Sequence, residues 1–389
     1  MNSTDTITLQ TPASQPPRVA RLTDAIRRPS RPTAPATGFP IGILPGEGIG
    51  PEVVKVDMDV LACVGEHTDC RFDITEGGPI GHAAAKSNGD DLSPEVIEFC
   101  EDLFARDGAV LCGPGGGRFV YDLRRQFDLF CKFTPVQSLS ALADAGVIKA
   151  QTRQDVDIIV VRENVGGLYF GEWGQKDKDS AHHTFGYTLA QVSRILQVSI
   201  TLAEQRRGRL MLALKPGGVP TISKLWSDCF SELTANTTLQ AQVMEIDNAV
   251  YQVLENAREF DVIIAPNMFG DVLSDACSLL LASRGMSFSG NFNTEGLSVY
   301  QTGHGAAHDL TGKAQANPVG QILSTVMMLR ESFALDQQAD AIEAAVEHTL
   351  RQGWRTRDIA GPDSTVVGTR QLGELICSRL ATLLTTASE

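Results

Sequence analysis

The chain has 389 residues, of which 42% are hydrophobic and 21% charged, and this is the balance of a globular protein large enough for about two domains. Its formal net charge of −14 opposes general binding to nucleic acid or to an anionic membrane, so an anionic ligand would need a local basic pocket. No apolar run approaches the roughly 20 residues of a membrane span. The eight cysteines form no CxxC pair or zinc-spaced cluster, which favours free thiols and a cytoplasmic location.

Residues 1–37 differ in composition from the rest of the chain. They are rich in Ser, Thr, Pro and Arg and contain no aromatic residue, and this predicts a disordered N-terminal tail. No apolar segment of a secretory signal follows Met1. A transit peptide is an alternative interpretation, against which the acidic Asp5 and Asp24 argue.

From Phe39 onward, short apolar runs alternate with amphipathic stretches. The runs predict strands covered on both faces of a sheet, at residues 41–44, 109–112, 157–161, 210–214 and 261–265. Two helical stripes are formed by Val53, Val56, Val60 and Val64 and by Ile322, Val326, Leu329 and Phe333. The alternation predicts an α/β fold. Because no linker rich in Pro or Gly is visible, two domains would be joined by more than one crossing of the chain.

A glycine-rich turn, LPGEGIGPE at residues 44–52, joins the first strand to the first helix. Pro51 suits the first position of a helix. The spacing is GxGxG, whereas the dinucleotide fingerprint is GxGxxG. The local pattern therefore allows either a cofactor-binding loop or a tight strand-to-helix turn.

Acidic residues and one lysine suggest a metal site. Asp271 and Asp275 are four residues apart and would share one face of a helix, where their oxygens suit Mg²⁺ or Mn²⁺, and Asp247 would be a third ligand. A solvated acidic face is the alternative. Lys215 follows the apolar run LMLAL, where neighbouring carboxylates and a metal would suit it as a base, although an exposed lysine is the simpler interpretation.

Two further segments suggest anion and nucleotide binding. Arg124 and Arg162 either hold carboxylates bidentately or form surface salt bridges. In the loop 303–318, GHGAAHDLTGKAQANP, the glycines allow close approach of a ligand. Asp309 of this loop would accept hydrogen bonds from a ribose diol and repel a 2′-phosphate. Taken alone, this segment is only a polar loop.

Together, and in this order, these segments resemble the isocitrate/isopropylmalate dehydrogenase family of β-decarboxylating dehydrogenases, of which the chain would be a divergent member. The resemblance runs from about residue 40 to residue 380. The matching segments are LPGEGIGPEVV at 44–54, LRRQFDLF at 123–130, VRENVGGLYFGE at 161–172, IDNAVYQV at 246–253, NMFGDVLSDACSLL at 267–280, GHGAAHDLTGKAQANP at 303–318 and MML at 327–329. The segment at 267–280 and the spacing of Arg124, Arg162 and Tyr169 are the most specific.

The resemblance implies a two-domain, isopropylmalate-dehydrogenase-like α/β fold that is not a Rossmann fold. A large cofactor-binding domain would combine residues 38–130 with 282–389, and a small domain, residues 131–281, would carry a homodimer interface. NAD would lie on the 303–318 loop and not at the glycine-rich turn. The residues expected to bind it are His304, Gly305, Asp309 and Asn317. Asp309 favours NAD because NADP-using members tend to carry a lysine there.

The resemblance also implies an oxidative decarboxylation of a malate-type di- or tricarboxylate. The metal ligands would be Asp271 and Asp275, with Asp247 contributed by the partner subunit. The metal would lower the pKa of the substrate hydroxyl, and Lys215 of the partner subunit would help to take its proton. After CO₂ leaves, Tyr169 would protonate the enol carbon, while Arg124 and Arg162 hold the carboxylates.

Two positions of the expected substrate pocket depart from the family pattern. Thr134 stands where the family has an arginine, and Gly217 where it has an asparagine. A lost carboxylate contact commonly costs on the order of a few kcal/mol when buried, and Lys132 would compensate if the segment is extended, because it then shares a face with Thr134. In the short loop 113–120, Arg118 either meets an extra anionic group of the substrate or lies in solvent.

These departures favour a specialised enzyme acting on a differently substituted malate over a housekeeping isopropylmalate or isocitrate enzyme. A tartrate/malate-type dehydrogenase is the second interpretation, since LKPGGV followed by Leu225 and Trp226 resembles that branch. A catalytically silent regulatory subunit is the third. Thr134 and Gly217 support it, whereas the intact Tyr169, Lys215 and aspartates oppose it.

Overall fold

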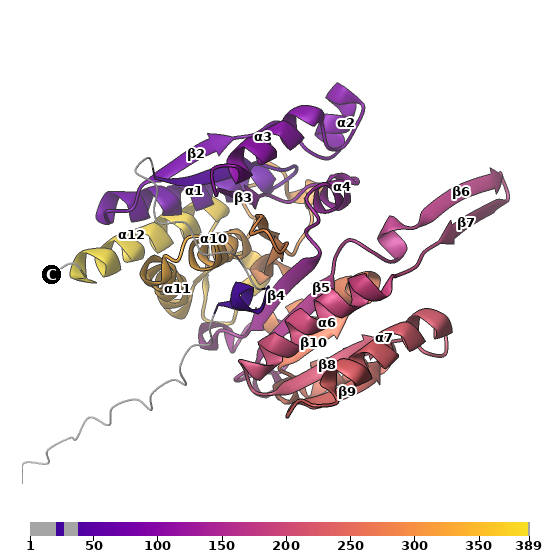
Figure 1. Cartoon of the computed structure of the whole chain (residues 1–389). Helices are drawn as coiled ribbons and strands as arrows, with labels where there is room; N and C mark the ends of the chain where they lie inside the picture. The colour runs from indigo at the N-terminus through magenta and orange to yellow at the C-terminus, as the bar shows by residue number, and fades with distance from the viewer. Residues whose placement is uncertain (1–20, 27–37, 388–389) are drawn as a thin grey trace, which may run out of the picture.

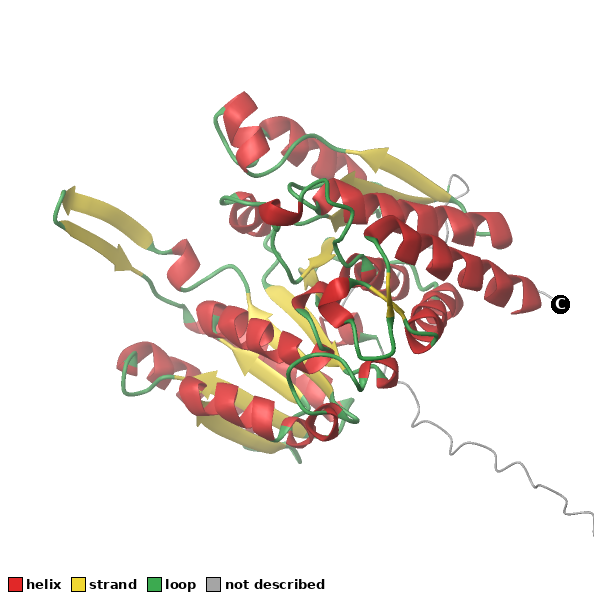
Figure 2. Ribbon diagram, turned by 180° about the vertical axis from the view of Figure 1, so that it is seen from behind, coloured by secondary structure: helices red, strands yellow, loops and turns green. Residues whose placement is uncertain are grey.

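A ten-stranded sheet runs through the molecule in the computed structural model, which describes residues 21–26 and 38–387 (Figure 1). The strand order is β2-β1-β3-β12-β11-β4-β5-β10-β8-β9. Helices lie on both faces of this sheet (Figure 2), which confirms the predicted α/β class. Within these described ranges, no helix is both long enough and apolar enough to cross a bilayer.

The first half-sheet is built from the two ends of the described chain: β1 (Phe39–Leu44), β2 (Phe72–Glu76), β3 (Ala109–Cys112), β11 (Phe288–Phe292) and β12 (Ser298–Thr302). In it, β2, β1, β3 and β12 are parallel, and β11 is antiparallel to β12. The second half-sheet comes from the middle of the chain: β4 (Cys131–Gln137), β5 (Asp157–Glu163), β8 (Arg209–Leu214), β9 (Gln240–Glu245) and β10 (Val262–Ala265). There, β4 is antiparallel to β5, and the other strands are parallel.

The two half-sheets are joined by three residue pairs between β11 and β4, which run antiparallel: Gly290 with Phe133, Asn291 with Lys132, and Phe292 with Cys131. The chain passes from one half to the other twice, after β3 and after β10, as the absence of a linker predicted. The expected domain boundary at 130/131 falls at the start of β4. The dimer interface assigned to residues 131–281 stays a prediction.

The helices follow the apolar periodicity of the sequence. Those near the first half-sheet are α1 (Gly50–His67), α2 (His82–Asn88), α3 (Pro94–Phe104), α4 (Phe119–Gln126), α10 (Val319–Glu331), α11 (Asp336–Arg351) and α12 (Thr369–Ala387). Those of the middle segment are α5 (Ala150–Arg153), α6 (Leu189–Glu204), α7 (Pro220–Thr234), α8 (Ile246–Glu255) and α9 (Asn267–Cys277). The predicted valine stripe of α1 is buried. Phe333 is buried as well, but it lies beyond the end of α10.

Smaller elements complete the fold. They are the 3₁₀ helices η1 (Leu22–Ile26), η2 (Ser140–Leu142), η3 (Leu168–Phe170), η4 (Ala257–Glu259), η5 (Ser278–Leu281), η6 (Arg284–Met286), η7 (His308–Leu310) and η8 (Arg357–Ile359), and the short pair β13 (Trp354–Arg355) and β14 (Thr365–Val366). The antiparallel strands β6 (Glu172–Asp177) and β7 (Ser180–Thr184) form an arm that projects from the body (Figure 1). All eight cysteines are free, as expected.

The prediction of a disordered tail is wrong for residues 21–26. Thr23, Ala25 and Ile26 of η1 are buried, and the Glu331 carboxylate accepts hydrogen bonds from the Leu22 and Thr23 amides at 3.2 and 3.0 Å and from the Thr23 hydroxyl at 2.7 Å. The segment is too short to change the polar composition on which the prediction was based. Its hydrogen-bond partner, Glu331, lies on α10, far away in the sequence. The rest of the predicted tail lies outside the described residues.

Candidate active site

Three cationic side chains are buried where α4, β4 and β5 meet. The exposed fractions are 3% for Arg124, 7% for Lys132 and 2% for Arg162. Lys132 and Arg162 are register partners on β4 and β5, so the two charges lie on neighbouring strands. β4 is extended, as the compensation by Lys132 required, and Thr134 lies buried two residues farther along it. The structure thus brings together three of the four predicted substrate-binding residues.

Asp271 and Tyr169 complete this cluster. Arg162 Nη1 donates a hydrogen bond to Asp271, and its Nε donates to Asn267 Oδ1 at 2.9 Å. The Tyr169 hydroxyl donates to the other Asp271 oxygen at 2.9 Å, and the Arg162 guanidinium lies 5.6 Å from the Tyr169 ring centre. A residue of the expected metal site and the expected proton donor are therefore in direct contact.

The cluster carries an excess of buried positive charge. Burial lowers the pKa of Lys132 well below its usual value, and the neighbouring Arg124 and Arg162 lower it further. Burial, followed by the charge of Arg162, lowers the pKa of Arg124 to about 9. Arg124 Nε and Arg162 Nη2 are buried without a hydrogen-bond partner in the described part of the chain. Buried donors and charges of this kind suit an anionic group, such as a carboxylate.

The pKa values of the two acids of α9 are shifted in opposite directions: that of Asp271 is lowered, and burial raises that of Asp275. Burial raises the pKa of Asp271, but Arg162 and Lys132 outweigh it, so the pKa is lowered overall and the side chain stays a carboxylate. Burial, and next the charge of Asp271, raise the pKa of Tyr169, which keeps its phenol protonated. Asp275, one turn after Asp271, accepts a hydrogen bond from Arg284 Nη2 at 2.8 Å. Leu273 and Cys277 of the same helix are buried in the core.

Lys215 and Asp247 form a separate, exposed group. Lys215 Nζ donates to Glu245 at 2.7 Å and to Asp247 at 2.9 Å, and these hydrogen bonds raise the pKa of Lys215. A raised pKa is the opposite of what a general base requires, so a base role needs a change in these contacts. In the part of the chain that the structure describes, Asp247, Asp271 and Asp275 do not form a set of ligand atoms within 4.8 Å of one another. Their convergence across two subunits stays a prediction.

The loop 303–318 packs against the glycine-rich turn. The Ile49 amide donates to the Ala306 carbonyl at 2.9 Å. Gly48 has a φ of +60°, and a Cβ atom there would lie 2.0 Å from the same carbonyl oxygen, so only glycine fits. The glycine-rich turn is therefore a tight turn that supports the loop. Asp309 is exposed on the loop, and the space around Gly305 is open.

The other two residues predicted to bind a cofactor have partners inside the fold. His304 Nδ1 lies 3.0 Å from the Gly305 carbonyl, burial lowers the pKa of the imidazole, and its Nε2 is buried with no partner among the described residues. Asn317 Oδ1 accepts from the Val319 amide at 3.0 Å, and its Nδ2 donates to Asp358 at 3.1 Å. The polar atoms of Asn317 thus hold the start of α10.

Arg118 does not extend freely into solvent. Its guanidinium lies 4.7 Å from the Trp173 ring centre and 5.3 Å from that of Tyr121, and Nη2 donates to the Tyr169 carbonyl at 3.3 Å. It therefore connects α4 to the arm and to Tyr169. Gly217, the other departure from the family pattern, faces open space.

Two partners in the site were not predicted. Asn267 precedes Asp271 by four residues on α9, so the spacing that indicated Asp275 also indicates Asn267. No sequence pattern points to Arg284, because it follows the helix in a separate turn.

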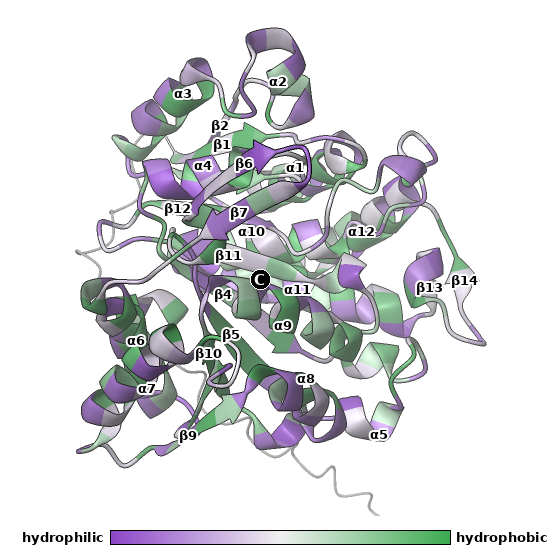
Figure 3. Cartoon of the chain, turned by 90° about the vertical axis from the view of Figure 1, so that its right-hand side faces the viewer, coloured by the Kyte–Doolittle hydropathy of each residue, from purple (hydrophilic) through white to green (hydrophobic). Residues whose placement is uncertain are grey.

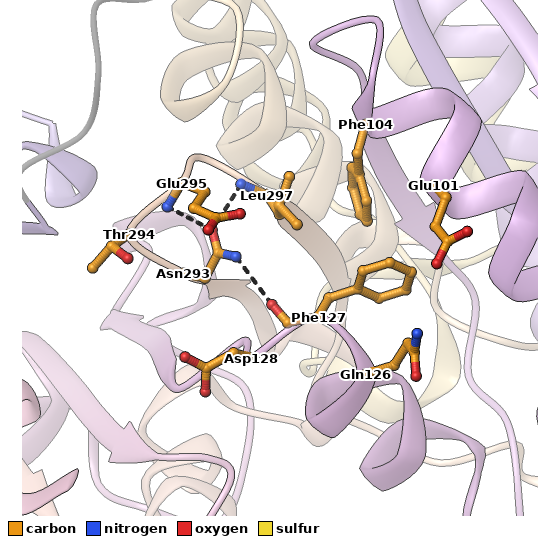
Figure 4. A pocket seen from close by; sticks show the side chains of 9 residues that line it. All are labelled: Glu101, Phe104, Gln126, Phe127, Asp128, Asn293, Thr294, Glu295 and Leu297. Carbon is orange, nitrogen blue, oxygen red and sulfur yellow. Dashed lines mark hydrogen bonds between the residues drawn. The ribbon is translucent and has the colours of Figure 1, made fainter. Parts of the chain in front are cut away.

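A groove of about 440 Å³ lies elsewhere, lined by the ends of α3 and α4 and the turn after β11 (Figure 4). Asn293 Nδ2 donates there to the Phe127 carbonyl at 3.0 Å, and its Oδ1 accepts from the amides of Glu295 and Leu297. None of the predicted site residues lines this groove. Its size therefore does not identify the site of chemistry.

Comparisons with known proteins agree with the arrangement. The family model described as isocitrate/isopropylmalate dehydrogenase matches residues 40–376. A 3-isopropylmalate dehydrogenase of Moorella thermoacetica is 35% identical over 356 residues, covering 87% of this chain and 98% of that protein. One from Bacillus licheniformis is 36% identical, covering 82% and 90%. The crystal structure of isocitrate dehydrogenase from Methylococcus capsulatus matches with a TM-score of 0.78 at 27% identity, covering 88% of this chain and 99% of that one.

Proposed function

The chain belongs to the isocitrate/isopropylmalate dehydrogenase family and is a β-decarboxylating dehydrogenase, and we propose that it oxidises a malate-type 2-hydroxy acid with NAD and Mg²⁺ in the cytoplasm. Family and fold are as the sequence indicated. The observation that carries the proposal is the buried cluster of Arg124, Lys132 and Arg162, whose unpartnered donors suit the carboxylates of a di- or tricarboxylate. Thr134 departs from the family pattern, and Lys132 lies two residues before it on the same strand. We assign both residues to contacts with the substituent that distinguishes this substrate.

The donors on α9 suit a hard cation. Asp271 and Asp275 present carboxylate oxygens one turn apart, and the partner subunit would add Asp247. Bound Mg²⁺ would supply Lewis-acid polarisation of the substrate's oxygen atoms. Arg162 orients Asp271 through its hydrogen bond. Tyr169, which is held protonated and donates to Asp271, would give a proton to the substrate carbon. Lys215 would receive the hydroxyl proton once a second subunit brings it to the site.

The loop 303–318 suits NAD. Asp309 is exposed to accept hydrogen bonds from a ribose, the backbone at Gly305 is open to a ligand, and the buried His304 Nε2 offers an unused polar atom. The carboxylate of Asp309 would repel the 2′-phosphate of NADP.

The surface of the middle segment supports a homodimer with shared sites. α8 and α9, which carry the acids Asp247 and Asp275, pack side by side (Figure 3). They expose Tyr251 and Val272, and η5, which follows α9, exposes Leu279. The arm β6–β7 projects from the body (Figure 1) and exposes Trp173. A second copy covering these surfaces would bury them and would carry Lys215 and Asp247 across the interface.

The test is a panel of 2- and 3-substituted malates and tartrate, with NAD⁺ or NADP⁺ and with or without Mg²⁺, followed by the absorbance of the reduced cofactor. We expect turnover of at least one malate that requires Mg²⁺ and prefers NAD⁺, and sedimentation as a dimer. Preference for tartrate would favour the tartrate/malate-type alternative. No turnover of any compound, together with binding to an active relative, would favour the silent subunit.

A further inference from the structure

Glu47, His82 and His308 bring their side chains together outside the candidate active site. They come from the glycine-rich turn, the start of α2 and η7, three segments that are distant in the chain. One ligand atom from each lies within 4.8 Å of the others, and His82 Nδ1 is 3.4 Å from Glu47 Oε2. None of the three contributes to the Arg124 cluster or to the acids of α9. Sequence reasoning gave none of them a role.

The carboxylate of Glu47 is fixed in place by the backbone. Its side chain is only 8% exposed, Oε1 accepts a hydrogen bond from the Ala83 amide at 2.8 Å, and Oε2 accepts one from the Gly116 amide at 2.7 Å. Burial raises the pKa of Glu47, but the hydrogen bonds from these amides outweigh it, so the group is charged. The backbone of His82 is a third donor to this carboxylate, so one of the four lone pairs on the two oxygens is left for a further partner.

The two histidines complete an accessible donor set. His82 has a side chain that is 68% exposed, and His308 is exposed on the loop, so an ion from solvent can reach both rings. Two imidazoles and one carboxylate suit borderline ions such as Zn²⁺, whereas Mg²⁺ and Ca²⁺ prefer oxygen donors alone. The amide hydrogen bonds that orient Glu47 are the outer contacts that a metal-binding carboxylate requires.

We propose that Glu47, His82 and His308 bind one divalent transition-metal ion of the Zn²⁺ type, which ties the 303–318 loop to the glycine-rich turn and to α2. The loop already contacts this turn through the Ala306 carbonyl and the Ile49 amide. The ion adds a second attachment two residues farther along, immediately before Asp309. Because it restrains the segment in advance, it lowers the entropic cost of ordering the loop around a ligand.

The metal site is tested with the full chain, stripped of metal by a chelator and kept in saturating Mg²⁺ so that the α9 acids are occupied. Calorimetric titration with Zn²⁺ should show one ion bound per chain. We expect His82→Ala and His308→Ala each to weaken this binding at least tenfold, and both to keep the circular dichroism of the wild type because the two side chains are exposed. His182→Ala, which removes an exposed histidine from β7, is the matched control and should bind as the wild type does.

Zn²⁺ binding that is absent, or equal in the wild type, His82→Ala and His308→Ala, would overturn the site. The result would then leave His82 and Glu47 as a surface ion pair only.

The link to the cofactor loop rests on the proposed function and has its own measurement. Titration of NADH by fluorescence should show severalfold tighter binding with Zn²⁺ than without it in the wild type, and no such difference in His308→Ala. Equal NADH affinity with and without Zn²⁺ in the wild type would overturn the link. Failure of NADH to bind any form would count against NAD as the cofactor and would leave the calorimetric result standing.

Discussion

The two half-sheets differ in how their charged groups are satisfied. Beside the first half-sheet, the buried Asp57 of α1 accepts hydrogen bonds from Thr325 and Gln321 of α10, at 2.8 and 3.3 Å, and Glu331 binds the backbone of η1. On the second half-sheet, Lys132 and Arg162 are buried, Arg162 Nη2 has no hydrogen-bond partner among the described residues, and Lys215 is partly exposed.

Apolar surface follows the same division. Of the nine large hydrophobic side chains exposed in the described ranges, eight lie between Val147 and Leu279, in the middle segment. Of these nine side chains, the half built from the chain ends carries only Val366. The predictions below test the proposal that an anion and a second copy cover the groups of the other half.

The largest effect is expected for Lys215→Ala. As an exposed residue, Lys215 contributes little to folding, so the free energy of unfolding should stay within about 0.5 kcal/mol of the wild type. As the base, it should contribute about 10²–10⁴-fold to the rate of NADH formation. Lys224→Ala on α7 removes another exposed, acid-paired lysine and is the control. Full activity of Lys215→Ala would exclude the base role.

The next effect concerns Asp57, a buried ionisable group of the first half. Burial raises its pKa to about 8, from an ordinary value of 3.8, despite the hydrogen bonds from Thr325 and Gln321. The folded protein therefore keeps a proton that the unfolded chain releases near pH 4. Stability should fall as pH rises from about 4 to about 8, by at most about 1.4 kcal/mol per unit, and should not change further above this window.

Asp57→Asn should remove that slope and should exceed the wild type in stability at pH 7 by roughly 2–4 kcal/mol. Urea unfolding at pH 5, 6, 7 and 8 measures the difference between the two proteins. An equal slope in both would show that Asp57 is charged in the folded state.

A smaller effect, on both stability and substrate binding, is expected for Lys132→Met. Removal of a buried cation beside two arginines should stabilise the free protein by about 1 kcal/mol or more, since apolar replacements of buried charges often do so. The same change should raise KM for the substrate about tenfold, because one charge-assisted contact is lost. Thr134→Val, two residues along the same strand, is the control, because it alters the pocket without removing a charge. A destabilised Lys132→Met would mean that the chain itself satisfies this lysine.

The smallest effect should come from Glu331→Gln. The substitution removes the charge that accepts hydrogen bonds from η1 and should lower the free energy of unfolding by about 1 kcal/mol. Limited proteolysis should then cut near Thr23 sooner than in the wild type. Unchanged cleavage would show that apolar burial alone holds η1.

Sequence reasoning found the strands whose runs are apolar throughout. It located β1, β3, β5, β8 and β10 within two residues at each end. It missed the other five strands of the large sheet, β2, β4, β9, β11 and β12. Lys132 and Thr134 in β4, the exposed polar residues of β9, and the buried Ser289 and Asn291 in β11 interrupt the hydrophobic patterns. In β11, tertiary hydrogen bonds satisfy the side chain of Asn291, which a local pattern reads as exposed.

The site was predictable where function follows local spacing or a family motif. The spacing indicated Asp271 and Asp275, and the resemblance indicated Arg162 and Tyr169, which the fold brings into contact with Asp271. Arg284 and the Glu47–His82–His308 set depend on segments that meet only in three dimensions. The periodicity of a single segment cannot predict contacts between segments that are distant in the sequence.

The joint between the half-sheets has a mechanical consequence. Only three residue pairs connect β11 to β4, whereas seven connect β4 to β5, and Lys132 belongs to both ladders. Rotation of one half against the other would have to twist this narrow ladder. A ligand bound to Lys132 would therefore act directly on the strand pairing that joins the two half-sheets.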